Sequence, residues 1–364
     1  MRMPRSLDLN ITTRCNLRCR YCFHFGSPGE VENDLPTGEW CDFIAELGRA
    51  AVMDVCLGGG EPLLRPDLKH LITTIVSHRM RFSILTNGTL ISDELASFLA
   101  DTGRCNGIQV SLDGSVPGPH DACRGEGSFR RALRGLQCLR QHAVPITVRV
   151  TIHHHNLADL ENIACLLLEE LGLPSFSTNS ASHLGLCREN AEHLQLTPHE
   201  RTEAMERLLS LVERYGNRIS ATAGPLAEAL LWTEMENARR AGKPPPPDRG
   251  HLLACRAVMR KMAVRADGAM VPCSHLSHLV MGWINRDDLL KVWQEHPDLR
   301  RLRQRIHTPL SKFEFCRGCE YIPYCTGNCP ALAYNFLGID HHPSPDACLR
   351  RFLEAGGRLP QGPQ

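Results

Sequence analysis

The sequence lacks a charge excess of either sign, a long apolar run and a secretory-type start. Lys and Arg together number 41 and Asp and Glu number 40, so the formal net charge is +1. A chain this close to neutrality has no electrostatic footprint for nucleic acid or for an anionic membrane. No apolar run approaches the ~18 residues that a membrane-spanning helix needs, and the start, MRMPRSLD, has no apolar signal-peptide segment. We therefore expect a cytoplasmic protein whose partners are neither nucleic acids nor membranes.

Cysteine, by contrast, is abundant, with 17 residues in a chain of 364. In a reducing compartment such a number indicates metal binding or redox chemistry rather than disulfide bonds. The length is more than twice the ~150 residues of an average domain and predicts two domains. The hydrophobic content of 42% is sufficient for a sizeable core.

The first half of the chain alternates between short β-rich runs and amphipathic helical patterns. The predicted strands are Ser6–Thr12, Val52–Leu57, Phe82–Leu85, Gly107–Leu112, Pro145–Ile152 and Pro174–Ser177. The predicted helices lie near 37–49, 66–79, 92–101, 128–142 and 157–171. Successive βα units build a parallel sheet or barrel with helices outside. Six units are too few for a complete eightfold barrel, so we predict an α/β fold with a partial (β/α)6 TIM barrel.

Composition changes mark the predicted domain boundaries. The pattern at 197–241 is mainly helical, with an interruption near 218–224, and four consecutive prolines follow it. Such a run is a stiff linker. We predict a barrel with a helical extension at 1–240, a Pro-rich linker at 241–250, a small cysteine-rich domain at 251–350 and a C-terminal tail at 351–364.

Three cysteines follow the first predicted strand with the spacing C-x3-C-x2-C. They are Cys15, Cys19 and Cys22. Three neighbouring thiolates can hold three corners of a 4Fe–4S cluster. The fourth iron is then open to a substrate or cofactor, as a catalyst requires. The triplet alone is also compatible with a zinc knuckle or with buried thiols.

Polar, glycine-containing turns follow three neighbouring predicted strands. The sequence reads GGGEP at 58–62, TNG at 86–88 and SLDG at 111–114. Glycine lets a ligand approach the backbone, and a glutamate can accept a hydrogen bond from an ammonium group. Barrel enzymes place their sites at the carboxyl ends of the strands, where these turns lie. Their convergence on the cysteine triplet predicts a binding site at that end.

These motifs resemble those of the radical S-adenosylmethionine (SAM) enzymes, which share the cysteine triplet with an aromatic residue inside it, the Gly-Gly-Glu-Pro motif and a partial barrel. The resemblance implies that the triplet holds a 4Fe–4S cluster whose open iron is chelated by SAM. It also implies that SAM is cleaved to a 5′-deoxyadenosyl radical that abstracts a substrate hydrogen. The implied SAM contacts are Tyr21, Gly59, Gly60, Glu61, Pro62, Asn87, Ser111 and Arg124.

A second group of cysteines lies beyond the linker. They are Cys255, Cys273, Cys316, Cys319, Cys325, Cys329 and Cys348. Seven thiols are too many for one tetrahedral site and suit two centres, although structural zinc sites would fit this spacing too. The order C-x12-G-x4-C, C-x2-C-x5-C-x3-C, C resembles the SPASM domain that follows many radical SAM barrels.

The SPASM resemblance implies two auxiliary 4Fe–4S clusters, and so three clusters in the whole chain. The implied ligands of the outer cluster are Cys316, Cys319, Cys325 and Cys348, and those of the inner one are Cys255, Cys273 and Cys329. Some relatives supply a further cysteine where this chain has Lys261. The inner cluster is thus expected to have an open iron or another fourth ligand.

The remaining seven cysteines are mostly expected to be small core residues. Cys187 is the exception, because it follows the last predicted barrel strand; we single it out as a candidate catalytic hydrogen donor or fourth ligand. The histidines of the HHH run at 153–155 point to alternate faces of a strand and predict a solvated strand end. His275 and His278, beside Cys273, are candidates for contacts with a ligand cysteine.

The family resemblance also implies a class of substrate. SPASM-containing radical enzymes commonly modify peptides or proteins. The sulfatase-maturing branch uses an Asp after the cysteine that matches Cys273, and this chain has Ser274 there, which argues against that activity. The motifs CTGNCPA and HPSPDAC resemble the radical SAM/SPASM proteins of SynChlorMet-type peptide cassettes.

We therefore predict a peptide-modifying oxidoreductase that cross-links or otherwise modifies a ribosomal precursor peptide. With the first cysteine at residue 15, no recognition domain precedes the barrel, so we expect a separate small recognition protein and a reductant such as flavodoxin or ferredoxin. The alternatives are oxidation of a small molecule, sulfatase-type maturation and a non-catalytic iron–sulfur electron carrier.

Overall fold

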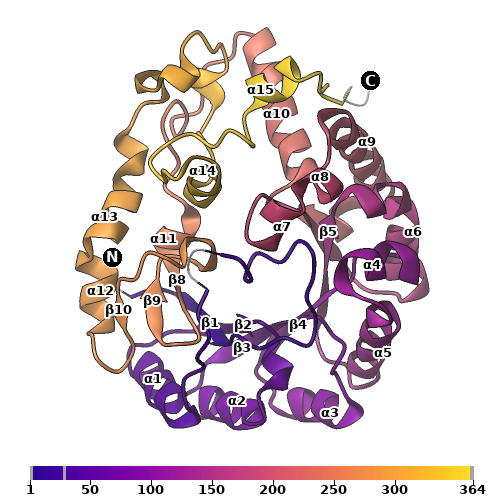
Figure 1. Ribbon diagram of the computed structural model, residues 1–364, viewed down its shortest axis with the longest axis vertical. Coiled ribbons are helices and arrows are strands. Elements are labelled where there is room, and N and C mark those ends of the chain that lie inside the picture. The colour runs from indigo at the N-terminus through magenta and orange to yellow at the C-terminus, as the bar shows by residue number, and fades with distance from the viewer. Residues whose placement is uncertain (1–2, 28–29, 361–364) are drawn as a thin grey trace.

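A single twisted sheet organises the molecule, as a computed structural model of residues 3–27 and 30–360 shows (Figure 1). The order of its strands is β10-β9-β8-β1-β2-β3-β4-β5-β6-β7. Strands β8 and β1 to β7 run parallel, whereas β9 and β10 pair antiparallel with their neighbours. The bounds are β1 Ser6–Thr12, β2 Asp54–Gly59, β3 Arg81–Thr86, β4 Cys105–Ser111, β5 Ile146–Ile152, β6 Phe176–Ser180, β7 Ile219–Ala221, β8 Lys261–Val264, β9 Ala269–Val271 and β10 Gly282–Trp283.

Helices cover the outer face of this sheet and extend beyond its last strands. Those of the barrel part are α1 Thr37–Arg49, α2 Leu68–Ser77, α3 Asp93–Asp101, α4 Pro117–Arg124, α5 Ser128–Gln141, α6 Leu160–Ala164, α7 Leu186–Glu189, α8 Ala191–Leu194, α9 Pro198–Tyr215 and α10 Pro225–Arg240. The remaining ones are α11 Arg256–Arg260, α12 Leu289–Glu295, α13 Pro297–Gln304, α14 Pro330–Leu337 and α15 Leu349–Glu354. None of the helices in the described residues is both long enough and apolar enough to span a bilayer.

The predicted partial barrel is confirmed, and its strands follow the predicted alternation. In β1 the side chains of Leu7, Leu9 and Ile11 are completely buried under the helices, whereas Asp8 and Asn10 lie half-buried on the opposite face. Successive strand side chains point to opposite faces. The concave face of the sheet is therefore polar, and the apolar core lies between the sheet and its helices.

The sequence interpretation missed short elements. Helix α4 begins Pro-Gly-Pro-His and lacks apolar periodicity, and β7 is the predicted interruption near 218–224, only three residues long. Strands this short are fixed by pairing with a neighbour rather than by their own sequence pattern. The predicted 157–171 helix starts and ends irregularly, with a 3-10 turn at His154–Asp159 and a π-helical stretch at Cys165–Glu170.

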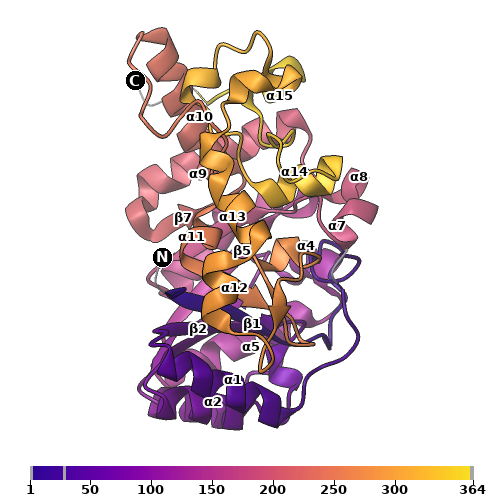
Figure 2. The same ribbon diagram turned by 90° about the vertical axis from the view of Figure 1, so that its left-hand side faces the viewer.

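The cysteine-rich segment is continuous with the barrel rather than separate in space. Strand β8 pairs in parallel with β1, and Lys261 Nζ donates a hydrogen bond of 2.8 Å to Asp8 Oδ2. Figures 1 and 2 show α12 on the same side of the molecule as α1, with α13 continuing from α12 away from α1. The four segments predicted from the sequence remain a proposal, and the barrel and the cysteine-rich segment among them share one sheet.

The predicted C-terminal tail packs on the helical extension. Trp232 of α10 and Phe352 of α15 lie in one apolar cluster, and Arg358 N donates a hydrogen bond of 2.9 Å to Thr202 Oγ1 of α9. Residues 361–364 of the predicted tail and residues 1–2 of the predicted barrel lie outside the described part.

Candidate iron–sulfur and S-adenosylmethionine site

The cysteine triplet lies in the long loop between β1 and α1, at the carboxyl end of the sheet. Cys22 N donates to Cys19 O at 3.0 Å, which closes a turn around the triplet. Leu186 N of α7 donates to Cys22 O at 2.9 Å, so the far end of the barrel supports the loop (Figure 1). The three thiols lie close enough to interact electrostatically. Burial raises the pKa of the Cys19 thiol to about 12, and Arg124 acts in the opposite direction.

The turn after β2 is clamped against this loop by backbone hydrogen bonds. Gly60 N donates to Thr12 O at 2.8 Å, and Glu61 N donates to Arg14 O at 2.7 Å. A Cβ atom on Gly60 would lie 2.3 Å from Arg14 O, so glycine is required for this approach. Pro62 is buried and starts a short 3-10 turn. Gly59 and Gly60 remain half-buried, which leaves their backbone near the surface of the site.

The Glu61 carboxylate points into the protein. Its oxygens accept hydrogen bonds from Thr86 Oγ1 at 2.8 Å, Asn87 N at 2.7 Å and Leu63 N at 3.1 Å. Burial raises the pKa of Glu61, and these donors act in the opposite direction. The completely buried carboxylate therefore ties the turns after β2 and β3 together.

Asn87 and Ser111 lie at the same end of the sheet. Asn87 Nδ2 donates to Asn16 Oδ1 at 2.9 Å and reaches Cys15 Sγ at 4.0 Å. Ser111 ends β4 and is half-buried. Asn87 thus positions the first cysteine of the triplet.

Arg124 and Tyr21 converge on Asp113, a residue to which the sequence interpretation gave no role. Asp113 is completely buried and accepts from Arg124 Nε at 2.6 Å, from Thr151 N at 2.8 Å and from the Tyr21 hydroxyl. Burial alone would raise the pKa of Asp113, but Arg124 and the neighbouring histidines more than offset it, and the net direction is down. The SLDG turn was the available signal, because this aspartate follows Ser111 by two residues.

His153 corrects the prediction of a solvated strand end. Its side chain is completely buried, its ring centroid lies 5.6 Å from that of Tyr21, and neither ring nitrogen has a hydrogen-bond partner. Burial lowers the pKa of His153 to about 4, so the ring is neutral near pH 7. His154 and His155 are exposed, as predicted.

The polar face of the sheet forms the floor of the site. Arg149 of β5 donates to Gln109 Oε1 at 3.3 Å and to Thr178 O at 3.4 Å. Among the ion pairs of the described residues none includes Arg149, and the Asn179 side-chain oxygen is buried without a partner. This floor therefore offers a guanidinium and an amide to a ligand that enters the barrel.

The seven C-terminal cysteines form two groups. Cys273 interacts electrostatically with Cys255 and Cys329, and burial raises the pKa of its thiol to about 12. Lys261 is engaged by Asp8, and the His275 ring packs 4.6 Å from Phe23. The predicted inner group is thus brought together, and its neighbours reach the loop that holds the triplet.

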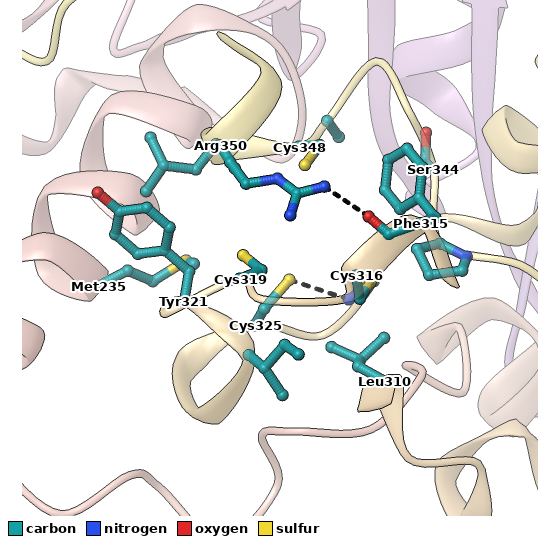
Figure 3. A pocket seen from close by; sticks show the side chains of 15 residues that line it. Met235, Leu310, Phe315, Cys316, Cys319, Tyr321, Cys325, Ser344, Cys348 and Arg350 are labelled. Carbon is teal, nitrogen blue, oxygen red and sulfur yellow. Dashed lines mark hydrogen bonds between the residues drawn. The ribbon is translucent and has the colours of Figure 1, made fainter. Parts of the chain in front are cut away.

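The other four thiols surround one cavity, which Figure 3 shows together with Arg350 and Tyr321. They are Cys316, Cys319, Cys325 and Cys348. Burial raises the pKa of Cys316 to about 12, and the neighbouring cysteines add to the effect. The arrangement gathers the predicted outer group at the end of the molecule far from β1 (Figure 2).

These donor sets fit iron–sulfur clusters. Thiolate is the ligand that such clusters use, and metal binding ionises thiols that are neutral in the metal-free protein. Within residues 3–27 and 30–360, no three His, Cys, Asp or Glu side chains converge closely enough to hold a single metal ion. In a four-iron cluster each thiolate binds a different iron, so convergence on one point is not required.

Cys187 is completely buried, and burial raises the pKa of its thiol to about 12. The structure places it on α7, next to the residues that contact the triplet loop. Its role as a hydrogen donor stays a prediction. Of the other cysteines, Cys123 is buried and Cys41, Cys105 and Cys138 pack against the core, whereas Cys56 lies half-buried.

Comparison with known proteins bears on this geometry. Residues 9–167 match the radical SAM superfamily, and residues 255–320 match the iron-sulfur cluster-binding SPASM domain. The chain has a radical SAM domain and a SPASM domain. The first match contains the cysteine triplet and the three polar turns, and the second contains four of the seven C-terminal cysteines.

The relatives of this chain differ in the activity that their names give. It is 26% identical over 353 residues to an AdoMet-dependent heme synthase of Methanosarcina barkeri, covering 96% of this chain and 97% of the relative. It is 38% identical over 165 residues to the mycofactocin maturase MftC of Mycobacterium tuberculosis. That match covers 45% of this chain and 41% of the maturase, so it spans less than half of either.

Solved structures share the fold over nearly the whole chain. Streptococcus suis SuiB bound to its precursor peptide SuiA has a TM-score of 0.71 at 17% identity, covering 96% of this chain and 76% of SuiB. The anSMEcpe structure with bound AdoMet has a TM-score of 0.68 at 19% identity, covering 96% of both chains. At these identities the likeness shows the fold alone.

Proposed function

We propose that this protein is a radical SAM enzyme that modifies a ribosomally made precursor peptide. The observation that carries the radical SAM part is the convergence of Cys15, Cys19 and Cys22 with the turn at Gly59–Glu61. SAM bound to a reduced 4Fe–4S cluster supplies a 5′-deoxyadenosyl radical, which takes a hydrogen atom from the substrate.

Each group of residues has a distinct proposed task. The triplet would hold three irons, and the half-buried backbone of Gly59 and Gly60, with the Ser111 hydroxyl, would meet SAM. Glu61 and Asn87 would position these turns, because their side chains are already bound to protein groups. Tyr21 and Arg124 would hold the loop on Asp113 rather than contact SAM through their polar ends.

The seven C-terminal cysteines would bind two auxiliary clusters, which makes three clusters in the chain. Cys255, Cys273 and Cys329 would hold the inner one, and the four thiols around the cavity of Figure 3 would hold the outer one. Lys261 is engaged by Asp8, so we propose no fourth protein ligand at the inner cluster from that position.

The peptide substrate is the finer part of the proposal. It is supported by the similarity to MftC and by the shared fold with SuiB, which binds a precursor peptide. The proposal includes the partners predicted from the sequence, which are a separate recognition protein and a flavodoxin or ferredoxin as reductant. It also includes the predicted resemblance to the proteins of SynChlorMet-type peptide cassettes.

A second candidate is the modification of an iron tetrapyrrole. It is favoured by the full-length similarity to a heme synthase and by a 38% identical match to an Fe-coproporphyrin III synthase of the same organism over 44% of this chain. Arg149 on the floor of the barrel would suit the carboxylates of a tetrapyrrole as well as those of a peptide.

The deciding experiment measures iron, sulfide and zinc per chain after anaerobic purification, and 5′-deoxyadenosine after addition of dithionite and SAM. About twelve irons per chain with formation of the nucleoside is the expected result. Fully loaded protein that forms no nucleoside would contradict the enzymatic proposal. Titration with Fe-coproporphyrin III, followed by its absorbance, separates the two substrate classes: saturable binding would favour the tetrapyrrole and its absence the peptide.

A further inference from the structure

Arg305 is a completely buried cation without a carboxylate partner in the described part of the chain. It follows α13 and is among the largest side chains with no exposed surface. Its guanidinium donates to three backbone carbonyls: Leu253 O at 3.2 Å, Asn328 O at 3.5 Å and Asp340 O. No ion pair among the described residues includes Arg305.

The neighbouring carboxylate is already bound by another arginine. Asp340 pairs with Arg301, whose Nη2 lies 2.8 Å from Oδ2. Burial lowers the pKa of Arg305 to about 10, with Asp340 acting in the opposite direction, so the guanidinium still carries its proton near pH 7. A buried charge without a partner is strongly unfavourable, and such charges in proteins are normally balanced.

The charge lies beside the inner cysteine group. Leu253 and Asn328, which accept from the guanidinium, are two residues before Cys255 and one residue before Cys329. Both thiols interact electrostatically with Arg305. The other groups that face Arg305 are Asp340, Arg301 and His341. Ionised cysteines holding a cluster would therefore supply the negative charge that this cation lacks.

At each of the other two cysteine groups, the neighbouring arginine has a carboxylate partner. Arg124, at Cys19, is paired with Asp113 at 2.6 Å. Arg350, at the outer group, donates to Phe315 O at 2.6 Å (Figure 3). It also lies 3.6 Å from a carboxylate oxygen of the exposed Glu354 side chain. The uncompensated, completely buried cation is thus at the inner group.

We propose that Arg305 is the counter-charge of the inner cluster and gives it the highest reduction potential of the three. This inference rests on the proposed function, because it requires iron–sulfur clusters at the cysteine groups. A fixed positive charge in a low-dielectric interior stabilises the more negative, reduced cluster. When an external one-electron donor supplies one electron, it resides first at the inner cluster. Arg305 is a positioning residue for charge and takes no part in bond making.

The test is a potentiometric titration of the iron-loaded full-length protein, with dithionite as the reductant and electron paramagnetic resonance as the readout. Cys329→Ala identifies the signal of the inner cluster by its loss. In the wild type we expect this signal at the highest potential. Arg305→Gln should lower its midpoint potential and leave the other two unchanged. Arg301→Gln is the matched control, because that arginine is already balanced by Asp340, and its inner midpoint should not move.

Arg305→Lys separates charge from structure, since lysine keeps the charge but loses the forked hydrogen bonds. A lysine variant whose inner cluster is still reduced first supports the proposal, including when Arg305→Gln fails to load iron. Two results would overturn the proposal. In the first, the inner cluster of the wild type is not the first to be reduced. In the second, the midpoint potential of the inner cluster falls as far in Arg305→Lys as in Arg305→Gln. If three clusters are present and only this order differs, the inference fails while the proposed function stands. If zinc occupies the inner site, the inference and the proposed inner cluster fail, whereas formation of 5′-deoxyadenosine still tests the radical SAM proposal.

Discussion

The guanidinium of Arg124 lies 2.6 Å from the carboxylate of Asp113, and both side chains are buried. The same guanidinium reaches Cys19 Sγ at 3.9 Å. One ion pair therefore connects the loop after β1, the turn after β4 and helix α4. The position of the second cysteine of the triplet depends on a carboxylate that is far from it in the sequence.

Asp113→Asn should destabilise the protein by about 3–5 kcal/mol, because it leaves the buried Arg124 charge without its partner. Denaturant unfolding under anaerobic conditions measures this. Asp54→Asn is the control: its partner Arg81 is half-exposed, and such pairs contribute only about 0–1 kcal/mol. Equal losses of unfolding free energy in the two variants would mean that the buried Arg124–Asp113 pair stabilises the protein no more than the half-exposed pair does.

Cys22→Ala should abolish formation of 5′-deoxyadenosine without unfolding the barrel, because one corner of the cluster is lost. Cys41→Ala serves as the control, since Cys41 lies on α1 outside the three cysteine groups. Nucleoside formation is measured by chromatography, and the fold by circular dichroism. Undiminished nucleoside in Cys22→Ala would rule out the assigned site.

Cys348→Ala should lose iron from the outer group while sparing some uncoupled SAM cleavage. Cys348 lines the cavity of Figure 3 with three other thiols and is remote in sequence from the triplet. Iron analysis should show a loss of about four irons per chain. An unchanged iron content would be incompatible with a cluster in that cavity. Cys138→Ala, at a core position, controls for the loss of a thiol.

Gly60→Ala should misplace the turn after β2, because its Cβ would lie 2.3 Å from Arg14 O. We expect a loss of at least tenfold in SAM affinity, about 1.4 kcal/mol, measured by equilibrium dialysis of the iron-loaded protein. Gly118→Ala is the matched control, since nothing lies within 4 Å of its added Cβ. Equal SAM affinity in the two variants would show that the close approach of Gly60 to the loop is unimportant for binding.

His153 should make the stability depend on pH. Its pKa is lowered to about 4 by burial, against about 6.5 in an unfolded chain. Between these values the unfolded state holds the proton and the folded state does not, so stability falls as the pH is lowered through this window. On going from pH 7 to pH 5.5, His153→Phe should lose about 1 kcal/mol less unfolding free energy than the wild type. An equal loss in both would mean that this ring is protonated in the fold.

The sequence predicted the barrel because its strands and helices have strong, separate periodicities. Strand Ser6–Thr12 and helix Thr37–Arg49 lie at the residues expected. The pairing of β8 with β1 was not predictable, because it joins Ser6 to Lys261 and no local pattern records such a contact. For the same reason the short strand β7 was read as an interruption.

The cysteine groups were predictable from spacing and family resemblance, whereas the polar groups around them were not. Asp113, His153 and Arg305 acquire their character from burial, which depends on elements distant in the sequence. The HHH run illustrates this: His153 is completely buried while the two histidines that follow it are exposed. Strand alternation would place His153 and His155 on one face, but β5 ends at Ile152 and a 3-10 turn begins at His154, so the alternation does not extend to these histidines.

The pairing of β1 with β8 also determines when the site can be completed during synthesis. The partner for the outer edge of β1 is made about 250 residues after β1, which takes roughly 10 to 50 s at typical rates of translation. Until then the strand that leads into the cysteine triplet has an open edge, which is prone to pair with other chains. The nascent chain must therefore be kept soluble before any iron is delivered, because β8, which covers the open edge of β1, is made much later than β1.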